Sequence, residues 1–322
     1  MFGARSRETP QRIGFFLVPR FSMIALTSAV ETLRLANRSS GLDLYRWPLV
    51  SDDGGPVVAS NGIPLAADWA VGECESLSMV VVCGGVDIQR YENRKTYSWL
   101  RRLTRGGSDV GALCTGSHLL ARSGLLDGYR CTIHWEHLAG FREEFPDIEV
   151  TCELFEIDRD RFTCSGGTAA ADLMLNLVAR QHGHELAAEV ADQLIHDRIR
   201  GPHDHQRVAL RTRLGASHPK LLAVAARMEE HLEEPLSCGE LAASVGLSTR
   251  HLERLFRKYV GRTPTRYYLE LRLDRARLLL VQTSLSALDV ALACGFVSAS
   301  HFTKCYRDRF GRTPREERRQ PS

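Results

Sequence analysis

The amino-acid sequence predicts two domains of different class: a doubly wound α/β domain, followed by an all-α domain with two helix-turn-helix units. In the first two thirds of the chain, short apolar runs alternate with segments of helical periodicity, which indicates parallel strands covered by helices on both faces. In the last third, one helix-turn-helix pattern occurs twice. A polar stretch interrupted by Gly201 and Pro202 separates the two regions.

The predicted boundaries follow this change of pattern. We expect a flexible N-terminus over residues 1–11, the α/β domain over 12–197, a linker over 198–217, the helical domain over 218–317 and a tail over 318–322. The 322 residues, of which 43% are hydrophobic and 25% charged, are enough for two globular cores. No apolar run approaches the length of a membrane span, and the polar first dozen residues lack the apolar core of a signal peptide. We therefore expect a cytoplasmic protein.

Each element of the α/β domain is predicted from an apolar run or a helical repeat. Continuous apolar runs indicate strands that are buried on both faces. The predicted elements are a strand at 13–18, a helix at 22–37, a strand at 79–83, a helix around 97–103, a strand at 109–113, a helix through 119–121, a strand ending at 165–167 and a closing helix at 169–181.

Residues 112–116 read Ala-Leu-Cys-Thr-Gly and have the strand, sharp turn and helix layout of a nucleophile elbow. Such a turn would expose Cys114 at the carboxyl end of the sheet. The adjacent helix N-terminus would favour its thiolate form.

This elbow, with Gly-Leu-Leu-Asp-Gly at 124–128 and Thr-Ile-His-Trp at 132–135, resembles the PfpI-like superfamily of the class I glutamine amidotransferase-like fold. The resemblance covers roughly residues 11–183 and implies a flavodoxin-like domain. It places Cys114 at the nucleophile position and His134 at a histidine that some members have after the elbow. Thr115 stands where the proteases carry histidine, and Ala25 where other members have a glutamate beside the cysteine.

With both of those groups absent, no evident side chain activates the thiol or orients a base. We therefore interpret Cys114 as the floor of a ligand pocket. The alternatives are a cysteine-dependent amidase or hydrolase with an accessory DNA-binding tail, and a redox-sensing thiol.

The helical domain repeats itself at an offset of 49 residues, so that Gly246 pairs with Gly295. Each copy has a short first helix (238–245 and 288–294), a glycine that ends it in a left-handed turn, a serine N-cap (Ser248 or Ser298) and a second helix. The side chains expected to pack inside the units include Leu241, Val245, Leu252, Leu255 and Phe256 in the first copy and Leu288, Leu292, Phe302, Cys305 and Tyr306 in the second.

A helix-turn-helix reads base edges from the N-terminal part of its second helix. The candidate DNA-binding residues on these helices are Thr249, Arg250, Glu253, Arg254 and Lys258 in the first copy and Ala299, Ser300, Thr303, Lys304 and Arg307 in the second. Residues 218–322 hold 18 Lys and Arg against 12 Asp and Glu, whereas the whole chain has a net charge of only +3. The basic charge is therefore concentrated in the domain that would meet phosphates. A generic helical hairpin with a solvated face is the alternative, and the duplication argues against it.

Pro264 fits the first turn of a long helix that runs to about Gln282 and would act as a strut between the two units. Successive major grooves on one face of DNA are about 34 Å apart, so a strut of this kind would set how the two units engage the duplex. Residues 218–317 resemble the AraC/XylS family of bacterial regulators. The resemblance implies base contacts from Arg250, Glu253 and Arg254 and from Ala299, Ser300, Thr303 and Lys304. Ala299 can offer only a methyl contact, so base discrimination there should be weak.

A PfpI-like domain followed by an AraC-type module is the architecture of the GlxA-type transcriptional regulators. The stretches 21–31, 33–38, 45–47 and 60–62 are similar to regulators of glycine betaine, carnitine and choline catabolism, although regulators that sense amino acids such as arginine share much of the scaffold. The resemblance implies a DNA-binding regulator, expected to be an activator, that is controlled by a small quaternary ammonium metabolite.

Aromatic faces and nearby acids recognise a quaternary ammonium, and backbone amides at a helix N-terminus suit its carboxylate. The candidate ligand-binding residues are Cys114, Thr115, Gly116, His134, Trp135, Glu31 and Trp47.

No cofactor or metal is expected. The nine cysteines show no paired spacing, and the His-Gly-His and His-Asp-His triplets at 182–184 and 203–205 lack further ligands at metal spacing. The expected partners are promoter DNA, a small-molecule inducer, RNA polymerase and a second copy of the chain, for which a helix at 185–199 is one candidate surface.

Overall fold

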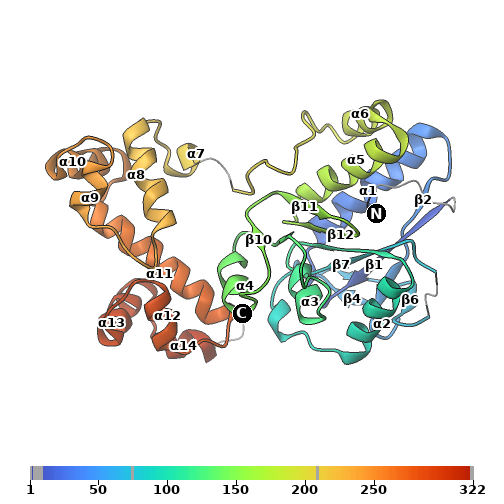
Figure 1. Ribbon diagram of the computed structural model, residues 1–322, viewed down its shortest axis with the longest axis horizontal. Coiled ribbons are helices and arrows are strands. Elements are labelled where there is room, and N and C mark those ends of the chain that lie inside the picture. Colours follow the sequence, from blue (N-terminus) through green and yellow to red (C-terminus); the bar gives the residue numbers. More distant parts are fainter. Residues whose placement is uncertain (1, 3–9, 74–75, 208–209, 320–322) are drawn as a thin grey trace. The chain divides into compact units, whose positions relative to one another are not determined.

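The computed structural model describes residues 2, 10–73, 76–207 and 210–319. The chain divides into two compact units, residues 1–206 and 207–322 (Figure 1). The boundary falls inside the stretch predicted as a linker, whose first nine residues belong to the first unit. Most of the predicted flexible N-terminus (1–11) and the last three residues of the predicted tail (318–322) lie outside the described residues.

The first unit is built on an eight-stranded sheet with the order β11-β12-β8-β7-β1-β3-β6, in which β2 also pairs with β1. The strands are β1 (Gln11–Leu17), β2 (Tyr45–Arg46), β3 (Leu49–Ser51), β6 (Trp69–Ala70), β7 (Met79–Cys83), β8 (Asp109–Leu113), β11 (Phe155–Asp158) and β12 (Arg161–Cys164). Among these pairs only β11 with β12 is antiparallel. Strands β1, β7, β8 and β12 end level with one another, because Leu17, Cys83, Leu113 and Cys164 are neighbours in register.

Helices cover both faces of this sheet, as the alternating pattern predicts. Figure 1 shows α1 (Met23–Ser40), α5 (Ala169–His182) and α6 (His184–Gln193) on one face, and α2 (Arg94–Arg105) and α3 (Gly116–Arg122) on the other. Two apolar cores result. Phe15 packs in the core under α1 and α5, whereas the next residue, Phe16, packs in the core under α2 and α3. Burial on both sides explains why β1 is a continuous apolar run.

Shorter elements complete the first unit. They are β4 (Val57–Val58) with β5 (Pro64–Leu65), a single 3-10 turn η1 (Ile88–Arg90), β9 (Cys131–Thr132) with β10 (Val150–Thr151), and α4 (Leu138–Glu144). The predicted helix at 185–199 is shorter than expected, because α6 ends at Gln193. The residues that follow extend along the unit in irregular backbone.

Helices are the only regular secondary structure in the described part of the second unit. Its helices are α7 (Leu210–Leu214), α8 (Pro219–Glu230), α9 (Cys238–Ala243), α10 (Thr249–Val260), α11 (Pro264–Gln282), α12 (Ala287–Ala293), α13 (Ala299–Phe310) and α14 (Pro314–Arg319). Helices α9 with α10 and α12 with α13 are the two helix-turn-helix pairs. Both first helices begin with a capping box, Ser237 with Glu240 and Ser286 with Asp289.

Helix α11 holds the two pairs together and has the bounds that the sequence predicts. Arg309 of α13 donates to Asp274 of α11 at 2.7 Å. Arg272 of α11 donates to the carbonyls of Cys294 and Gly295 at 2.7 Å each. Arg272 thereby fixes the turn between α12 and α13 to the connecting helix.

The prediction that Leu288 and Leu292 form the buried face of α12 is wrong, because both side chains are 54% exposed. Val290 and Ala291 are buried instead. The offset of 49 residues explains this, since it aligns Val290 with the buried Leu241 of the first copy. Cys305, also expected inside, is only partly buried.

Candidate functional site

The two recognition helices begin where the sequence places them. Ser248 accepts a hydrogen bond from the amide of His251, and Ser298 accepts one from the amide of His301, both at 3.3 Å. These are the predicted N-caps. The preceding turns are left-handed at Gly246 (φ +63°) and Gly295 (φ +72°), where a glycine is favoured because it has no Cβ.

The outer faces of α10 and α13 are exposed to solvent. Leu252, Leu255 and Phe256 anchor α10, and Phe302 and Tyr306 anchor α13. Of the ten candidate DNA-binding residues, Glu253 is half-buried and the other nine are exposed: Thr249, Arg250, Arg254, Lys258, Ala299, Ser300, Thr303, Lys304 and Arg307. Each helix therefore presents polar and basic side chains from its first turn onward.

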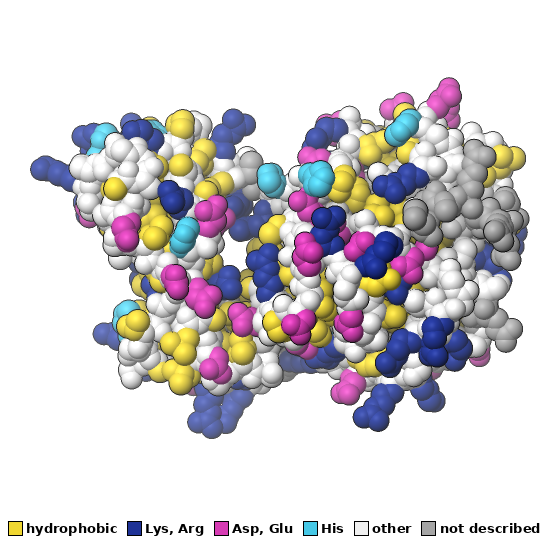
Figure 2. Space-filling model, viewed as in Figure 1, with side chains coloured by type: hydrophobic (Ala, Val, Ile, Leu, Met, Phe, Trp, Pro, Cys, Tyr) yellow, Lys and Arg dark blue, Asp and Glu magenta, His cyan; other side chains and the backbone are white. Residues whose placement is uncertain are grey.

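The charge around these helices suits a polyanion. In the view of Figure 2 acidic and basic side chains are interspersed over both units, and the basic excess of the second unit is a matter of its sequence, with 18 Lys and Arg against 12 Asp and Glu in residues 218–322. Two recognition helices on one strut, with a net positive charge, can contact bases and phosphates of one duplex.

The second candidate site is the elbow at Cys114, which directly follows β8. Cys114 has a left-handed backbone conformation (φ +60°), as a strained strand-to-helix turn requires. Its amide donates to the carbonyl of Cys164 at 2.9 Å, and its carbonyl accepts from the amide of His134 at 3.2 Å. The elbow is thus held between the end of β12 and the segment that follows β9.

Two glycine turns make room for the elbow. A Cβ at Gly166 would lie 2.7 Å from the Cβ of Cys114, and a Cβ at Gly84 would lie 2.3 Å from the amide nitrogen of Gly116. Thr115 is buried and donates to the carbonyl of Gly85 at 2.7 Å. Gly84 and Gly166, which follow β7 and β12, therefore leave the space that the elbow occupies.

The surroundings of the Cys114 thiol set its pKa. Burial raises its pKa to about 12, a backbone hydrogen bond from Thr115 opposes the shift, and the negative charge of Glu136 adds to it. The backbone at the helix N-terminus favours the thiolate, as expected, but desolvation outweighs this effect and the net shift of the pKa is upward. Ala25, where a glutamate would be needed to assist the thiol, is buried in the core.

His134, Trp135 and Glu136 form a group beside the elbow. The rings of His134 and Trp135 are 5.6 Å apart between centroids, and Trp135 is 36% exposed. Nδ1 of His134 lies 3.9 Å from a carboxylate oxygen of Glu136. Burial lowers the pKa of His134, and the charge of Glu136 only partly opposes this. His137 follows them, and burial together with its histidine neighbours lowers its pKa to about 3. The group is therefore neutral at its imidazoles and negative at Glu136.

Glu31 and Trp47 do not join this group. Trp47 lies between β2 and β3, beside the first half of β1, whereas Cys114 follows the carboxyl end of β8. Glu31 is eight residues from the start of α1, about 12 Å along the helix axis. It forms an exposed ion pair with Arg34 at 2.6 Å. The residue types of both suit a quaternary ammonium, but a residue type carries no information on which end of the sheet its side chain occupies.

Glu136 is the residue that the sequence analysis missed. Glu136 is next to His134 and Trp135 in the sequence, which is the signal that could have identified it. Its proximity to the Cys114 thiol depends on the path of the chain after β9, which the sequence does not show. Among the described residues, no group of three or more His, Cys, Asp or Glu could hold a metal ion. In the described part of the chain, no helix combines the length and the apolarity needed to span a membrane.

Comparison with known proteins gives a family match for each of the two units. Residues 11–180 match the DJ-1/PfpI family, and residues 241–320 match a helix-turn-helix domain family. The chain is 52% identical over 311 residues to the HTH-type transcriptional regulator GbdR of Pseudomonas aeruginosa, covering 97% of this chain and 85% of that protein. It is 38% identical to the HTH-type transcriptional regulator GlxA of Rhizobium meliloti over 320 residues, or 99% of each chain.

A solved structure supports the fold of the first unit. The crystal structure of an AraC family transcriptional regulator from Pseudomonas putida matches 57% of this chain and 100% of its own, with a TM-score of 0.54 and 33% identity. The relatives match in both units and in their order along the chain. This chain therefore belongs to the GlxA-type transcriptional regulators, in which a DJ-1/PfpI-family domain precedes an AraC-type helix-turn-helix domain that binds DNA.

Proposed function

We propose that the first unit of this regulator is a sensor for a small carboxylate that carries a quaternary ammonium group, of the glycine betaine or carnitine class. The observation that carries the proposal is that the exposed Trp135 and the carboxylate of Glu136 both lie near His134, next to the elbow. A quaternary ammonium has no proton to donate, so an aromatic face and a nearby negative charge are the groups that bind it. The resemblance to regulators of betaine and carnitine catabolism points to the same class.

The state of His134 supports this ligand class. Because burial lowers the pKa of His134, its imidazole is neutral near pH 7 and adds no positive charge next to the proposed cation site. The carboxylate of the ligand would be held at the elbow by the backbone of Thr115 and Gly116 above Cys114. For this, the Thr115 amide would exchange its hydrogen bond to the thiol for one to the ligand.

We propose further that the sensor is not catalytic and that Cys114 is the floor of the ligand site. The raised pKa of the thiol removes the nucleophile that the amidase alternative needs, and Ala25 and Thr115 leave it without the usual assisting groups. Glu136 lies by His134, where it can attract a cation as well as orient an imidazole. The amidase alternative is therefore not favoured.

Regulation would follow from ligand-dependent binding of promoter DNA by the second unit. We propose that the protein works in the cytoplasm as a homodimer that activates transcription and contacts RNA polymerase. Two chains would bring four recognition helices to two half-sites, which suits operators of two-fold symmetry.

Replacing Trp135 by alanine tests the sensor. Glycine betaine and 3,3-dimethylbutanoate, in which a carbon replaces the quaternary nitrogen, share shape and carboxylate, so their affinity ratio, measured by titration calorimetry, isolates the cation. We expect the wild type to prefer glycine betaine, and Trp135→Ala to reduce that preference by about 2- to 30-fold, because cation–π contacts contribute about 0.5–2 kcal/mol.

Trp135→Phe should retain part of the preference, since it keeps an aromatic face. Trp47→Ala is the matched control, because Trp47 belongs to the same unit but lies away from the elbow, and it should leave the preference unchanged. A wild type that binds both compounds equally, or a Trp135→Ala protein that keeps the full preference, would refute the proposed sensor site.

A further inference from the structure

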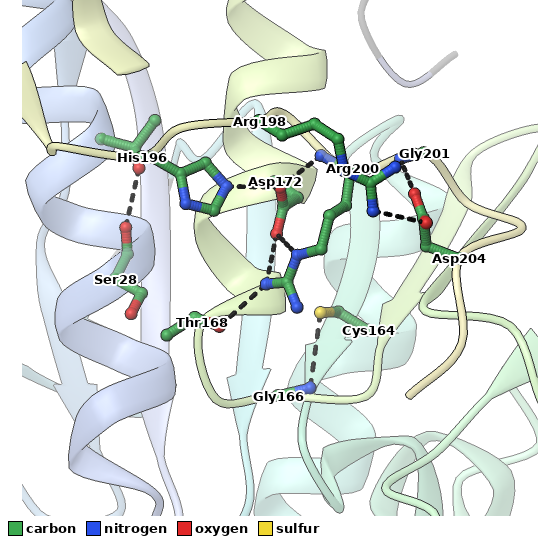
Figure 3. Close-up of polar contacts among 11 residues, drawn as sticks. Ser28, Cys164, Gly166, Thr168, Asp172, His196, Arg198, Arg200, Gly201 and Asp204 are labelled. Atoms are coloured by element: carbon green, nitrogen blue, oxygen red, sulfur yellow. Dashed lines mark hydrogen bonds and ion pairs between the residues drawn. The ribbon is translucent and has the colours of Figure 1, made fainter. Parts of the chain in front are cut away.

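The last segment of the first unit, residues 196–206, lies on that unit as a strap that is anchored at two places. The sequence predicts a linker from residue 198 onward. Figure 3 shows that its polar side chains are instead engaged with α5 and with one another.

The first anchor is the carboxylate of Asp172, near the start of α5, which is 0% exposed. It accepts hydrogen bonds from Nε2 of His196 at 2.8 Å and from the amide of Arg200 at 2.7 Å. The guanidinium of Arg200 adds two more, at 2.9 and 2.6 Å, and also donates to Thr168 at 2.8 Å. A buried carboxylate with this many charge-assisted partners holds the strap firmly.

The second anchor is at the end of the strap. Nε2 of Gln206 donates to the hydroxyl of Thr132 at 2.9 Å and to the carbonyls of Ile133 and Glu153 at 3.1 and 2.8 Å. The carbonyl of Pro202 accepts from the amide of Leu154 at 2.9 Å. The carboxamide oxygen of Gln206 is buried and meets no donor within the described ranges. This anchor can therefore change partners more readily than the first.

Both anchors are made on segments that form the elbow. Thr168 follows the turn whose Gly166 packs against Cys114. Ile133 immediately precedes His134, which donates its amide to the carbonyl of Cys114. A displacement of either segment by a bound ligand would therefore alter the bonds of Arg200 or of Gln206.

The strap also leads directly into the second unit. Gln206 is followed by Arg207, whose guanidinium pairs with Glu229 of α8 at 3.6 Å. Glu229 also binds Arg213 of α7 at 2.9 Å. Between the last contact with the sensor and the first contact with the DNA-binding unit there is a single peptide bond.

We propose that the strap couples the ligand site to the DNA-binding unit, with Arg200 and Gln206 as its positioning residues. This inference rests on the proposed sensor function. The anchored arrangement is made by protein groups alone, and the ligand acts by shifting the elbow segments and releasing the strap. Release changes the restraint on Arg207 and with it the DNA affinity of the second unit.

The test measures the affinity of the full-length protein for an operator duplex, with and without saturating glycine betaine, by fluorescence anisotropy. A coupling free energy of the usual size between ligand and DNA would make the operator affinities of the wild type, with and without glycine betaine, differ by about 5- to 150-fold. We expect Arg200→Ala without ligand to show the affinity of the ligand-saturated wild type, and to change less than about twofold when ligand is added. Its calorimetric affinity for glycine betaine should show that the sensor site is intact.

Arg198→Ala is the matched control, because it removes the same charge two residues away, and among the described residues Arg198 forms its ion pair within the strap, with Asp204 at 2.7 Å. It should behave as the wild type. Gln206→Leu tests the second anchor independently and should reproduce the Arg200→Ala result even if the latter variant folds poorly. The inference fails if ligand-free Arg200→Ala and Gln206→Leu both keep the wild-type DNA affinity. If those variants shift DNA affinity while the wild type ignores glycine betaine, the strap stands and the proposed ligand is wrong.

Discussion

Replacing both Arg250 and Arg254 by alanine is expected to lower operator affinity by about 30-fold or more, because each arginine contact to a base contributes about 1–3 kcal/mol. Both side chains are exposed on the first turns of α10, where a recognition helix meets base edges. Fluorescence anisotropy at one fixed salt concentration measures the loss on an operator duplex and on a random duplex of equal length.

The comparison between the two duplexes decides the role of these arginines. Base contacts predict a larger loss on the operator than on the random duplex. Arg101→Ala with Arg105→Ala is the charge-matched control, because both are exposed on α2 of the first unit, and it should change neither affinity appreciably. An equal loss on both duplexes, with a reduced salt dependence, would show that Arg250 and Arg254 bind only phosphates.

The Gly295→Ala substitution is expected to have the largest effect on stability. Gly295 has φ +72°, and a Cβ there would lie 2.5 Å from Cγ of Pro235 and 2.7 Å from the carbonyl oxygen of Glu233. A left-handed backbone costs an alanine about 1–2 kcal/mol, and overpacking adds about 1–3 kcal/mol. Hydrogen exchange of the amides in α12 and α13 measures how readily the second helix-turn-helix opens.

Gly246→Ala provides the matched comparison in the first copy. Gly246 has a similar φ of +63°, but the nearest atom to its Cβ would be the flexible end of Lys220 at 3.9 Å. This variant should show the backbone cost without the clash. An equal loss of amide protection in the two variants would mean that residues 233–235 move to accommodate the added Cβ. The contact of Gly295 with Glu233 and Pro235 would then not be rigid.

The sequence predicts the elements that depend on neighbours along the chain. Residues 112–116 form the expected elbow, and Ser248 and Ser298 cap the expected helices. The long helix has its predicted ends at Pro264 and Gln282 because its caps and its start are local features. Because the helix-turn-helix pattern occurs twice, its helices and caps are predicted from two separate stretches of sequence.

What the sequence could not predict depends on contacts between distant residues. Nothing near residue 200 indicates that Arg200 meets Asp172, so its stretch reads as a linker. Similarly, burial raises the pKa of Cys114, and the Thr115 backbone at the start of the adjacent helix only partly opposes this. Leu288 and Leu292 match the spacing of a buried face, yet the register of the duplication buries Val290 instead.

Two equivalent recognition helices on one strut are expected to read duplex DNA. The most direct measurement is selection of bound duplexes from a random pool by the full-length protein, followed by sequencing. The structure predicts recovered duplexes that share two short blocks about one helical turn apart, or 10–10.5 base pairs. The block read by α10 should be more sharply defined than the block read by α13, which begins with Ala299. A recovered pool without shared sequence, at salt low enough for binding, would show that α10 and α13 do not recognise base sequence.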